Sequence, residues 1–343
     1  MARGGCAADY RLVGIVRVLA GATLTVAPGV VVRGDPATRG TLVVSRGGQL
    51  VADGTAEQPI SFTSAAATPA PGDWGGVLLL GRAPTNSRAG GRIEGLPDAE
   101  LYGGDDPDDT SGVLRFVRIT YAGVSLAPNN ETNGLTLGGV GSGTVVDHVL
   151  VANASDDCFE WFGGAVNASH LVCVNPGDDG FDMDLGFVGT VEDLVLVDHV
   201  GGDAERNGIE VDNDPTGSAA VPRTAPTVRR ATLCGAGPRA SRPGFALLLR
   251  RGAGGSYSDI GVDGFSAVLD VRDQVAVELR GLSRAEGVPV GPPEVTGAEE
   301  DDDHGLDEAS IAQVELGPAC GSPPIGGPGL APGDRWDVGW VEW

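Results

Sequence analysis

Four segments in the middle of the chain share one pattern: Asn133-Gly134-Leu135, Asp157-Cys158-Phe159, Asp179-Gly180-Phe181 and Asn207-Gly208-Ile209. In each segment an Asn or Asp is followed by one residue and then by a large apolar side chain. The segments start 24, 22 and 28 residues apart, and strand-like stretches recur between them at 147–151, 169–173 and 193–196. A repeat of this length built from short strands indicates stacked coils.

The rest of the sequence supports an all-β solenoid. Short alternating segments such as 23–26, 41–44 and 59–63 are separated by Gly, Pro, Asp and Asn, and 56 of the 343 residues are Gly. No sustained helical period is present to supply βαβ crossovers. We therefore predict a right-handed parallel β-helix, with the four motif segments on neighbouring parallel strands of one sheet about 5 Å apart.

The Asn/Asp position of the motif is interpreted as a structural ladder. Asn and Asp tolerate the left-handed backbone of a tight turn, and their side chains can bond the next coil. We expect the solenoid to occupy residues 1–290, including N-terminal cap strands, because a β-helix must cover its open ends. Residues 291–343 are expected to form an acidic loop and a C-terminal tail whose Trp336, Trp340 and Trp343 pack back on the solenoid.

Several further segments carry a family resemblance. They are Gly47–Thr55, Pro59–Ser64, Gly72–Gly76, Asn133–Thr144, Asp156–Gly164 and the ending Trp336–Trp340. With these segments the chain resembles a widespread family of secreted or cell-surface bacterial β-helix proteins of the pectin-lyase-like kind. The resemblance implies the fold and a location outside the cell or on its surface, and it brings no catalytic residues with it.

The charge of the chain limits its partners. Asp and Glu number 47 against 23 basic residues, which gives a net charge of −24. A surface this negative repels phosphate backbones, so we expect no nucleic-acid partner. No apolar run reaches the length of a membrane span, and no export signal is visible in the chain. The oligomeric state is left open.

The five cysteines are Cys6, Cys158, Cys173, Cys234 and Cys320. No two of them form a Cys-x-x-Cys pair, which argues against a zinc finger or a thioredoxin-like site. One or two disulfides are expected in an oxidising compartment, and the sequence leaves their pairing open.

Alternation along the motif strands places acidic side chains on the outer face. Phe159, Phe181 and Ile209 point to the core, so Glu160, Asp182 and Glu210 should form one outer column. Asp184 and Asp212 should begin a second column, with Asp156 and Asp178 at the border. Like charges directly opposite one another destabilise a sheet, so such a column needs a reason.

Three interpretations of these carboxylates stay open. They are a solvated face, a Ca²⁺ site formed by Glu160, Asp182, Asp184, Glu210 and Asp212, or a catalytic set. The catalytic candidates are Glu160, Asp182, Glu210 and, as the base of a lyase, Arg206. The first functional hypothesis is a secreted or cell-surface protein that binds glycan or another surface component, stabilised by Ca²⁺. The alternative is a polysaccharide lyase or glycoside hydrolase that acts on acidic polysaccharide through the same face.

Two histidines also occupy matching positions on successive coils. His148 and His170 follow Asp147 and Ser169 at the same point of the strand-like stretches. We expect their rings to stack, either as a surface ladder or as a pair that binds a transition metal.

Overall fold

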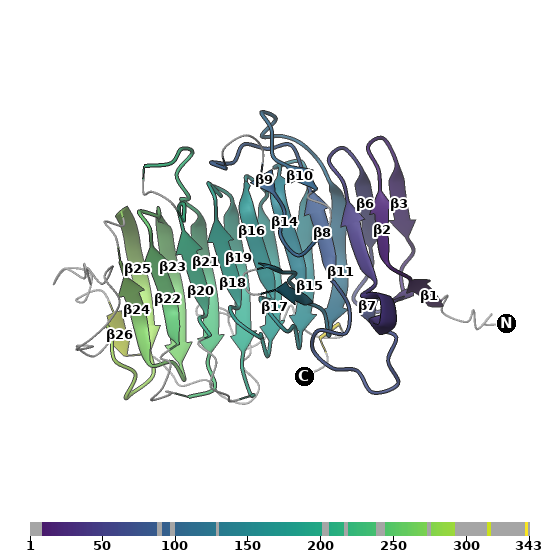
Figure 1. The fold of residues 1–343 in the computed structure, drawn as a ribbon. Coiled ribbons are helices and arrows are strands. Elements are labelled where there is room, and N and C mark those ends of the chain that lie inside the picture. Colours follow the sequence, from purple (N-terminus) through teal and green to yellow (C-terminus); the bar gives the residue numbers. More distant parts are fainter. Residues whose placement is uncertain are drawn as a thin grey trace.

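Two long sheets of parallel strands wind along one axis (Figure 1). The computed structural model describes residues 9–87, 91–96, 100–127, 130–200, 206–215, 219–237, 244–272, 276–291, 314–316 and 340–341. Within these residues the regular structure is strand apart from one short 3₁₀ helix, η1 (Pro36–Thr38). The strands follow one another from the N-terminal end, purple in Figure 1, to the green and yellow end.

The larger sheet, sheet A, contains 13 strands in the described part of the chain. They are β1 (Asp9–Leu12), β3 (Thr23–Val26), β4 (Val31–Gly34), β6 (Gln49–Asp53), β7 (Ile60–Ser64), β11 (Gly112–Thr120), β15 (Val145–Ala152), β17 (Ala168–Val174), β19 (Thr190–Val197), β21 (Thr227–Cys234), β23 (Gly254–Asp263), β25 (Ala276–Arg284) and β26 (Val314–Leu316).

The smaller sheet, sheet B, contains nine strands among the described residues. They are β2 (Ile15–Val18), β5 (Thr41–Val44), β8 (Val77–Leu80), β14 (Leu135–Val140), β16 (Phe159–Gly164), β18 (Phe181–Asp184), β20 (Ile209–Asp212), β22 (Phe245–Arg250) and β24 (Ala267–Val271). Two antiparallel pairs lie outside both sheets: β9 (Gly91–Arg92) with β10 (Leu101–Tyr102), and β12 (Ser125–Ala127) with β13 (Asn130–Glu131).

The register confirms the repeat predicted from the sequence. Leu135 pairs with Phe159, Phe159 with Phe181 and Phe181 with Ile209, all on parallel neighbours of sheet B. From β14 to β25 the strands of sheets B and A alternate along the chain, and the inward side chains of both sheets form one continuous apolar core. The chain is therefore an all-β parallel β-helix.

Each long strand of sheet A bends once, at a residue with a left-handed backbone. β6 pairs with the first half of β11 and β7 with its second half. One long strand of the later coils therefore corresponds to two short strands of the N-terminal coils. The bend falls at Phe116, and the aligned residues of the later coils also have positive φ: His148, His170, Asp193, Arg230, Asp259 and Gly281. Positive φ is uncommon outside glycine, so these positions carry a column of backbone bends.

The Asn/Asp column of the motif forms a ladder, but without left-handed backbone. The N–H of Asp157 donates to Asn133 Oδ1 (3.2 Å), that of Asp179 to Asp157 Oδ1 (2.8 Å), and that of Asn207 to Asp179 Oδ1 (2.6 Å). None of the four has positive φ. The predicted bond to the next coil is therefore confirmed. The predicted left-handed turn is wrong at this column, whereas the bends of sheet A do have left-handed backbone.

The residue after each ladder position packs against the opposite wall of the solenoid. A Cβ on Gly134 would lie 2.2 Å from Val151, and one on Gly180 would lie 2.1 Å from Leu196. In the coil between them the same place holds Cys158, which forms a disulfide with Cys173. Gly208 takes the same place against Leu233 in the fourth coil, so glycine makes room for a branched side chain in three coils and a covalent bridge replaces that contact in one.

We expect Gly180→Ala to destabilise the protein by about 1–3 kcal/mol, because the added methyl overpacks the core against Leu196. The φ of Gly180 is not positive, so the cost is steric rather than conformational. Urea denaturation of the single variant and of Gly180→Ala in a Leu196→Val background measures the coupling between the two sites. An equal loss in both backgrounds would contradict this packing explanation.

The end of the chain returns to sheet A. Trp340 is fully buried, its ring meets Phe116 edge-on at 6.0 Å, and Arg118 Nε donates to its carbonyl oxygen at 2.5 Å. The division at residue 290 stays a prediction, and Trp336, Trp343 and the predicted acidic loop lie outside the described residues.

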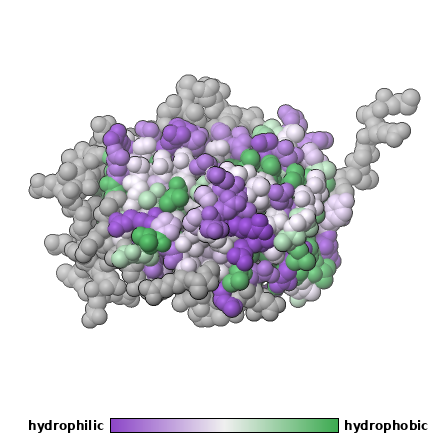
Figure 2. Space-filling model, turned by 90° about the horizontal axis from the view of Figure 1, so that it is seen from above, coloured by the Kyte–Doolittle hydropathy of each residue, from purple (hydrophilic) through white to green (hydrophobic). Residues whose placement is uncertain are grey.

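The hydrophilic character of the surface agrees with the high net charge of the chain. On the face seen from above in Figure 2, hydrophilic side chains gather in the middle and hydrophobic ones are scattered.

In the described part of the chain, no helix has the length and apolar character needed to cross a membrane.

Candidate functional site

The outer face of sheet B holds the predicted column of carboxylates. β16, β18 and β20 align Glu160 with Asp182 and Asp182 with Glu210. Towards the N-terminus the same column continues as Thr136 and Leu78. Period-two alternation on three stacked strands therefore brings the three acids together, as the sequence indicated.

This face is a cleft and not an open wall. Its volume is about 620 Å³. Its lining residues are Glu94, Glu131, Asp156, Asp157, Glu160, Gly177, Asp178, Asp179, Asp182, Asp184, Asn207, Glu210, Asp212, Arg250 and Arg251. Glu160 and Glu210 are only 6% and 8% exposed. A solvated face, the first interpretation of the column, does not describe these buried groups.

One wall of the cleft comes from segments that leave the solenoid. The segment that carries β9 and β10 folds over the outer face of sheet B, where Ile93, Leu96 and Tyr102 pack with Leu80 and Phe162. This packing brings Glu94 to the rim of the cleft, and Glu131 of β13 lies there as well. Sequence reasoning missed both residues, because the repeat does not predict where a segment outside the solenoid packs.

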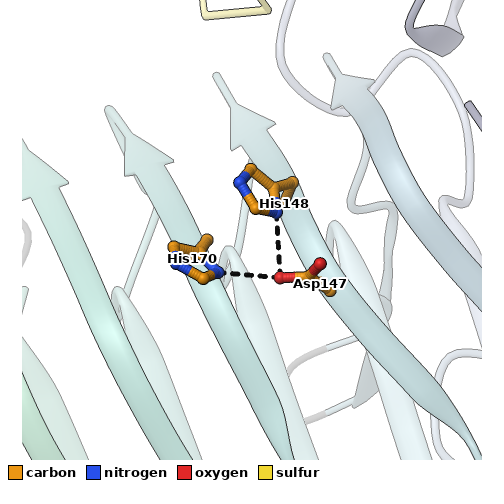
Figure 3. A group of neighbouring side chains, drawn as sticks. All are labelled: Asp147, His148 and His170. Carbon is orange, nitrogen blue, oxygen red and sulfur yellow. Dashed lines mark hydrogen bonds and ion pairs between the residues drawn. The ribbon is translucent and has the colours of Figure 1, made fainter. Parts of the chain in front are cut away.

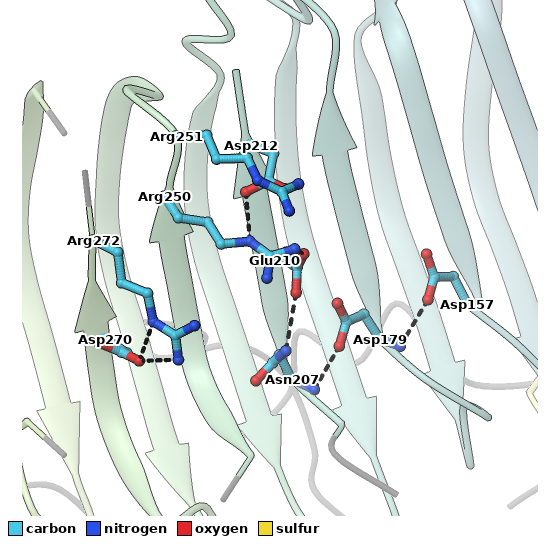
Figure 4. Close-up of polar contacts among 9 residues, drawn as sticks. All are labelled: Asp157, Asp179, Asn207, Glu210, Asp212, Arg250, Arg251, Asp270 and Arg272. Atoms are coloured by element: carbon cyan, nitrogen blue, oxygen red, sulfur yellow. Dashed lines mark hydrogen bonds and ion pairs between the residues drawn. The ribbon is translucent and has the colours of Figure 1, made fainter. Parts of the chain in front are cut away.

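Two arginines close the cleft at its C-terminal end (Figure 4). Arg250 of β22 pairs with Glu210 and, at 2.8 Å, with Asp212; Arg251 reaches Asp212 at 2.5 Å. Sequence reasoning missed both, although Arg250 aligns with Asp212 in the next coil. That coil lacks the Asn or Asp of the motif, and only the strand-like run from Phe245 could have identified it.

Arg206, named as a candidate base, lies elsewhere. Its guanidinium is 3.3 Å from Asp198 Oδ2 and donates to the carbonyl of Gly177 at 3.2 Å. It does not line the cleft, so the arginines available to the carboxylates are Arg250 and Arg251.

Burial and mutual repulsion raise the pKa values of eight carboxyl groups that line the cleft. Burial, followed by the charge of Asp178, raises the pKa of Asp156 to about 8. Burial raises the pKa of Glu210 to about 7, although the Arg250 guanidinium opposes the shift. The pKa of Glu94 also rises to about 7, through burial and then Glu131. Burial first and neighbouring charges second raise the pKa values of five further acids well above the ordinary range: Asp157, Glu160, Asp179, Asp182 and Asp184.

Two oxygen atoms in the cleft lack protein partners. Among the described residues, Asp182 Oδ1 and Asp184 Oδ1 are buried without a hydrogen bond. Asp270, further along the same sheet, is by contrast neutralised by Arg272 at 2.8 Å (Figure 4). Buried polar atoms are normally paired, so these two oxygens are available to a ligand.

The donor set fits a hard divalent cation. Oxygens of Asp157, Glu160 and Asp182 lie within 4.8 Å of one another, and so do oxygens of Asp179, Asp182 and Glu210. Ca²⁺ binds oxygens at roughly 2.4 Å, so two of its ligands are at most about 4.8 Å apart. Asp182 belongs to both groups, which makes it the central residue of the site.

None of the described histidines and cysteines lines this cleft. His148 and His170 stack on sheet A, with ring centroids 4.2 Å apart. Cys158 and Cys173 are joined inside the solenoid, and Cys234 is disulfide-bonded as well. Cys6 and Cys320 lie outside the described residues.

Comparison with known proteins gave one match. Residues 6–305 match a family model described as a pectate-lyase-like beta helix domain. No curated protein and no solved structure matches the chain.

Proposed function

Because the chain belongs to the pectate-lyase-like β-helix domain family, we propose that it binds polysaccharide through the acidic cleft, with Ca²⁺ as the bridging ion. The family suggests a polysaccharide-related role, and the cleft supplies the chemistry. The observation that carries the proposal is the pair of unpartnered, buried oxygens on Asp182 and Asp184 among so many carboxylates.

The ion explains how such a cleft binds a sugar chain. Bare carboxylates repel one another and any acidic sugar, whereas a divalent cation neutralises them and offers open positions to sugar oxygens. The cleft volume of about 620 Å³ lies within the range of ordinary ligand sites. Binding of an acidic polysaccharide is therefore expected to need Ca²⁺.

We place the protein outside the cell or on its surface. The buried bridge between Cys158 and Cys173 supports this location, because disulfides persist in oxidising compartments. The partner is then an extracellular polysaccharide or another cell-surface component.

Glycoside hydrolysis is the second candidate, and the raised pKa of Glu210, about 7, favours it. A carboxyl group that stays protonated near neutral pH can act as a general acid beside an ionised partner. A lyase gains less support. The pKa of Arg250 lies above its ordinary value despite burial, because Glu210 and Asp212 surround it, and such a group does not act as a base.

Asp182→Asn is expected to remove the response to Ca²⁺. At a concentration 100-fold above the dissociation constant, Ca²⁺ should stabilise the native protein by about 2.7 kcal/mol. That free energy corresponds to a rise in melting temperature of about 4 °C for a chain of this size. In the variant most of this rise should disappear. Stability without metal at neutral pH should increase, because folding no longer has to hold a proton on this buried carboxyl group.

The measurement compares melting in EDTA and in excess Ca²⁺ for the native chain, for Asp182→Asn and for Asp105→Asn. Asp105 is an exposed control that does not line the cleft. Pull-down on a panel of immobilised polysaccharides, with and without Ca²⁺, tests the partner. Equal melting of the native chain in both buffers would refute the Ca²⁺ site. Release of reducing ends that is lost in Glu210→Gln would replace binding by hydrolysis.

A further inference from the structure

A second polar cluster lies on sheet A, apart from the cleft on sheet B. It consists of Asp147 and His148 on β15 and His170 on β17 (Figure 3). The two imidazole rings are stacked, with an interplanar angle of 21°. The proposed polysaccharide site uses none of these side chains.

The Nδ1 atoms of both rings lie near the same carboxylate oxygen. His148 Nδ1 lies 2.9 Å and His170 Nδ1 2.8 Å from Asp147 Oδ1. Ser169 Oγ also donates to this oxygen at 3.0 Å, and Arg115 Nε lies 3.6 Å from the other carboxylate oxygen. Two imidazole nitrogens therefore lie close to one carboxylate oxygen, as Figure 3 shows, and the three atoms are within 4.8 Å of one another.

The backbone and the C-terminal tail hold this geometry. Both histidines sit at the left-handed bend of their strands, with φ of 54°, so neither ring can follow the ordinary strand direction. The His148 ring is packed by Phe116, whose centroid is 4.4 Å away, and by Trp340 at 5.6 Å. A site with its rings fixed in advance loses little entropy when a ligand binds.

The cluster is still open on one side. The side chains of His148, His170 and Asp147 are 15%, 29% and 25% exposed. An ion can therefore enter from solvent, and water can complete its coordination.

We infer that Asp147, His148 and His170 form a binding site for a borderline divalent transition-metal ion such as Zn²⁺. Imidazole nitrogen suits Zn²⁺, Cu²⁺ and Ni²⁺, whereas the oxygen-rich cleft of sheet B suits Ca²⁺. Zinc lies about 2.0–2.1 Å from its nitrogen and oxygen ligands, so the three side chains need to move by less than about 1 Å. The Trp340 contact makes this a site at which a bound ion also secures the tail.

The test is titration of the full chain with Zn²⁺ by calorimetry, in excess Ca²⁺ so that hard-ion sites are occupied. The variants are His148→Asn and His170→Asn, because Asn tolerates the left-handed backbone that both positions need. The matched control is His199→Asn, which removes an exposed histidine outside the cluster. Circular dichroism verifies that each variant is folded.

We expect one equivalent of Zn²⁺ to bind to the native chain and to the control with the same affinity. Loss of an outer partner of a metal ligand already costs about 10–100-fold in affinity, so loss of either ligand should cost at least about tenfold. Equal affinity in all four proteins, or no binding to the native chain, overturns the inference.

A spectroscopic measurement identifies the donor atoms independently. With one equivalent of Cu²⁺ in place of Zn²⁺, the electron paramagnetic resonance spectrum should show coupling to two imidazole nitrogens. In folded His170→Asn the coupling should fall to one nitrogen. A spectrum with oxygen ligands alone in the native chain would place the ion in the carboxylate cleft and would refute the site on sheet A.

Discussion

The free energy of unfolding of the metal-free protein is expected to fall as the pH rises from about 5 to about 8, by at least about 4 kcal/mol. Most proteins gain stability over the acid part of this range, as their paired carboxylates ionise. The opposite trend here follows from the acidic cleft, whose carboxyl groups have raised pKa values in the folded state.

The sign follows from proton binding. Asp156 has a pKa of about 8 when folded, against an ordinary value of 3.8, and Glu210 and Glu94 have pKa values of about 7 against 4.5. Between the unfolded and folded values the native state holds more protons, so stability falls with rising pH. The contribution is complete below about pH 4 and is lost as the pH passes about 7–8. Three pH units for one such group correspond to about 4 kcal/mol.

Thermal melting in EDTA across this pH range measures the effect. The slope should flatten in Asp156→Asn, which removes one of these groups, and should persist in the exposed control Asp105→Asn. Excess Ca²⁺ should also reduce the slope, because the ion takes over the role of the protons. Stability that is level or that rises with pH in EDTA would show that the cleft carboxylates ionise freely.

Removal of the bridge between Cys158 and Cys173 is expected to cost about 3 kcal/mol. The bridge closes a loop with a sequence separation of 15 residues, and loop entropy predicts a loss of this size. Both cysteines are fully buried, so the double variant Cys158→Ala/Cys173→Ala also leaves cavities and should lose more.

A variant that copies the preceding coil separates the two contributions. In Cys158→Gly/Cys173→Val the coil takes the pair found at Gly134 and Val151, which packs without a bridge. This variant should regain the free energy of unfolding that core packing contributes, and it should still unfold at a lower urea concentration than the native chain. If it is as stable as the native chain, the disulfide contributes nothing beyond its volume.

The architecture could be predicted because it is a local property that repeats. The motif from Asn133 to Ile209 recurs at coil spacing, and alternation determines which side chains of a strand share a face. Stacking then aligns Glu160, Asp182 and Glu210 without further information. The same reasoning matched His148 with His170 across neighbouring coils.

The backbone conformation at single residues was harder to predict from the sequence. Asn and Asp suggested left-handed turns at the ladder, whereas the left-handed residues include Phe116, His148 and Arg230. Side-chain type is a poor predictor of which residues have left-handed backbone, because the bend of sheet A arises where two short strands join into one long strand of the coil. Tertiary structure overrides the local preference.

The sequence by itself therefore determined the coils, the order of strands and the column of acids on one face. Only the tertiary structure decided that this face is a cleft, because Glu94, Glu131 and Arg251 reach it from segments outside the aligned columns. The physical reason is the sequence distance over which each kind of interaction acts. A strand repeat relates residues that are one coil apart. The position of a segment that leaves the solenoid depends instead on apolar contacts such as Tyr102 against Phe162, which no local pattern encodes.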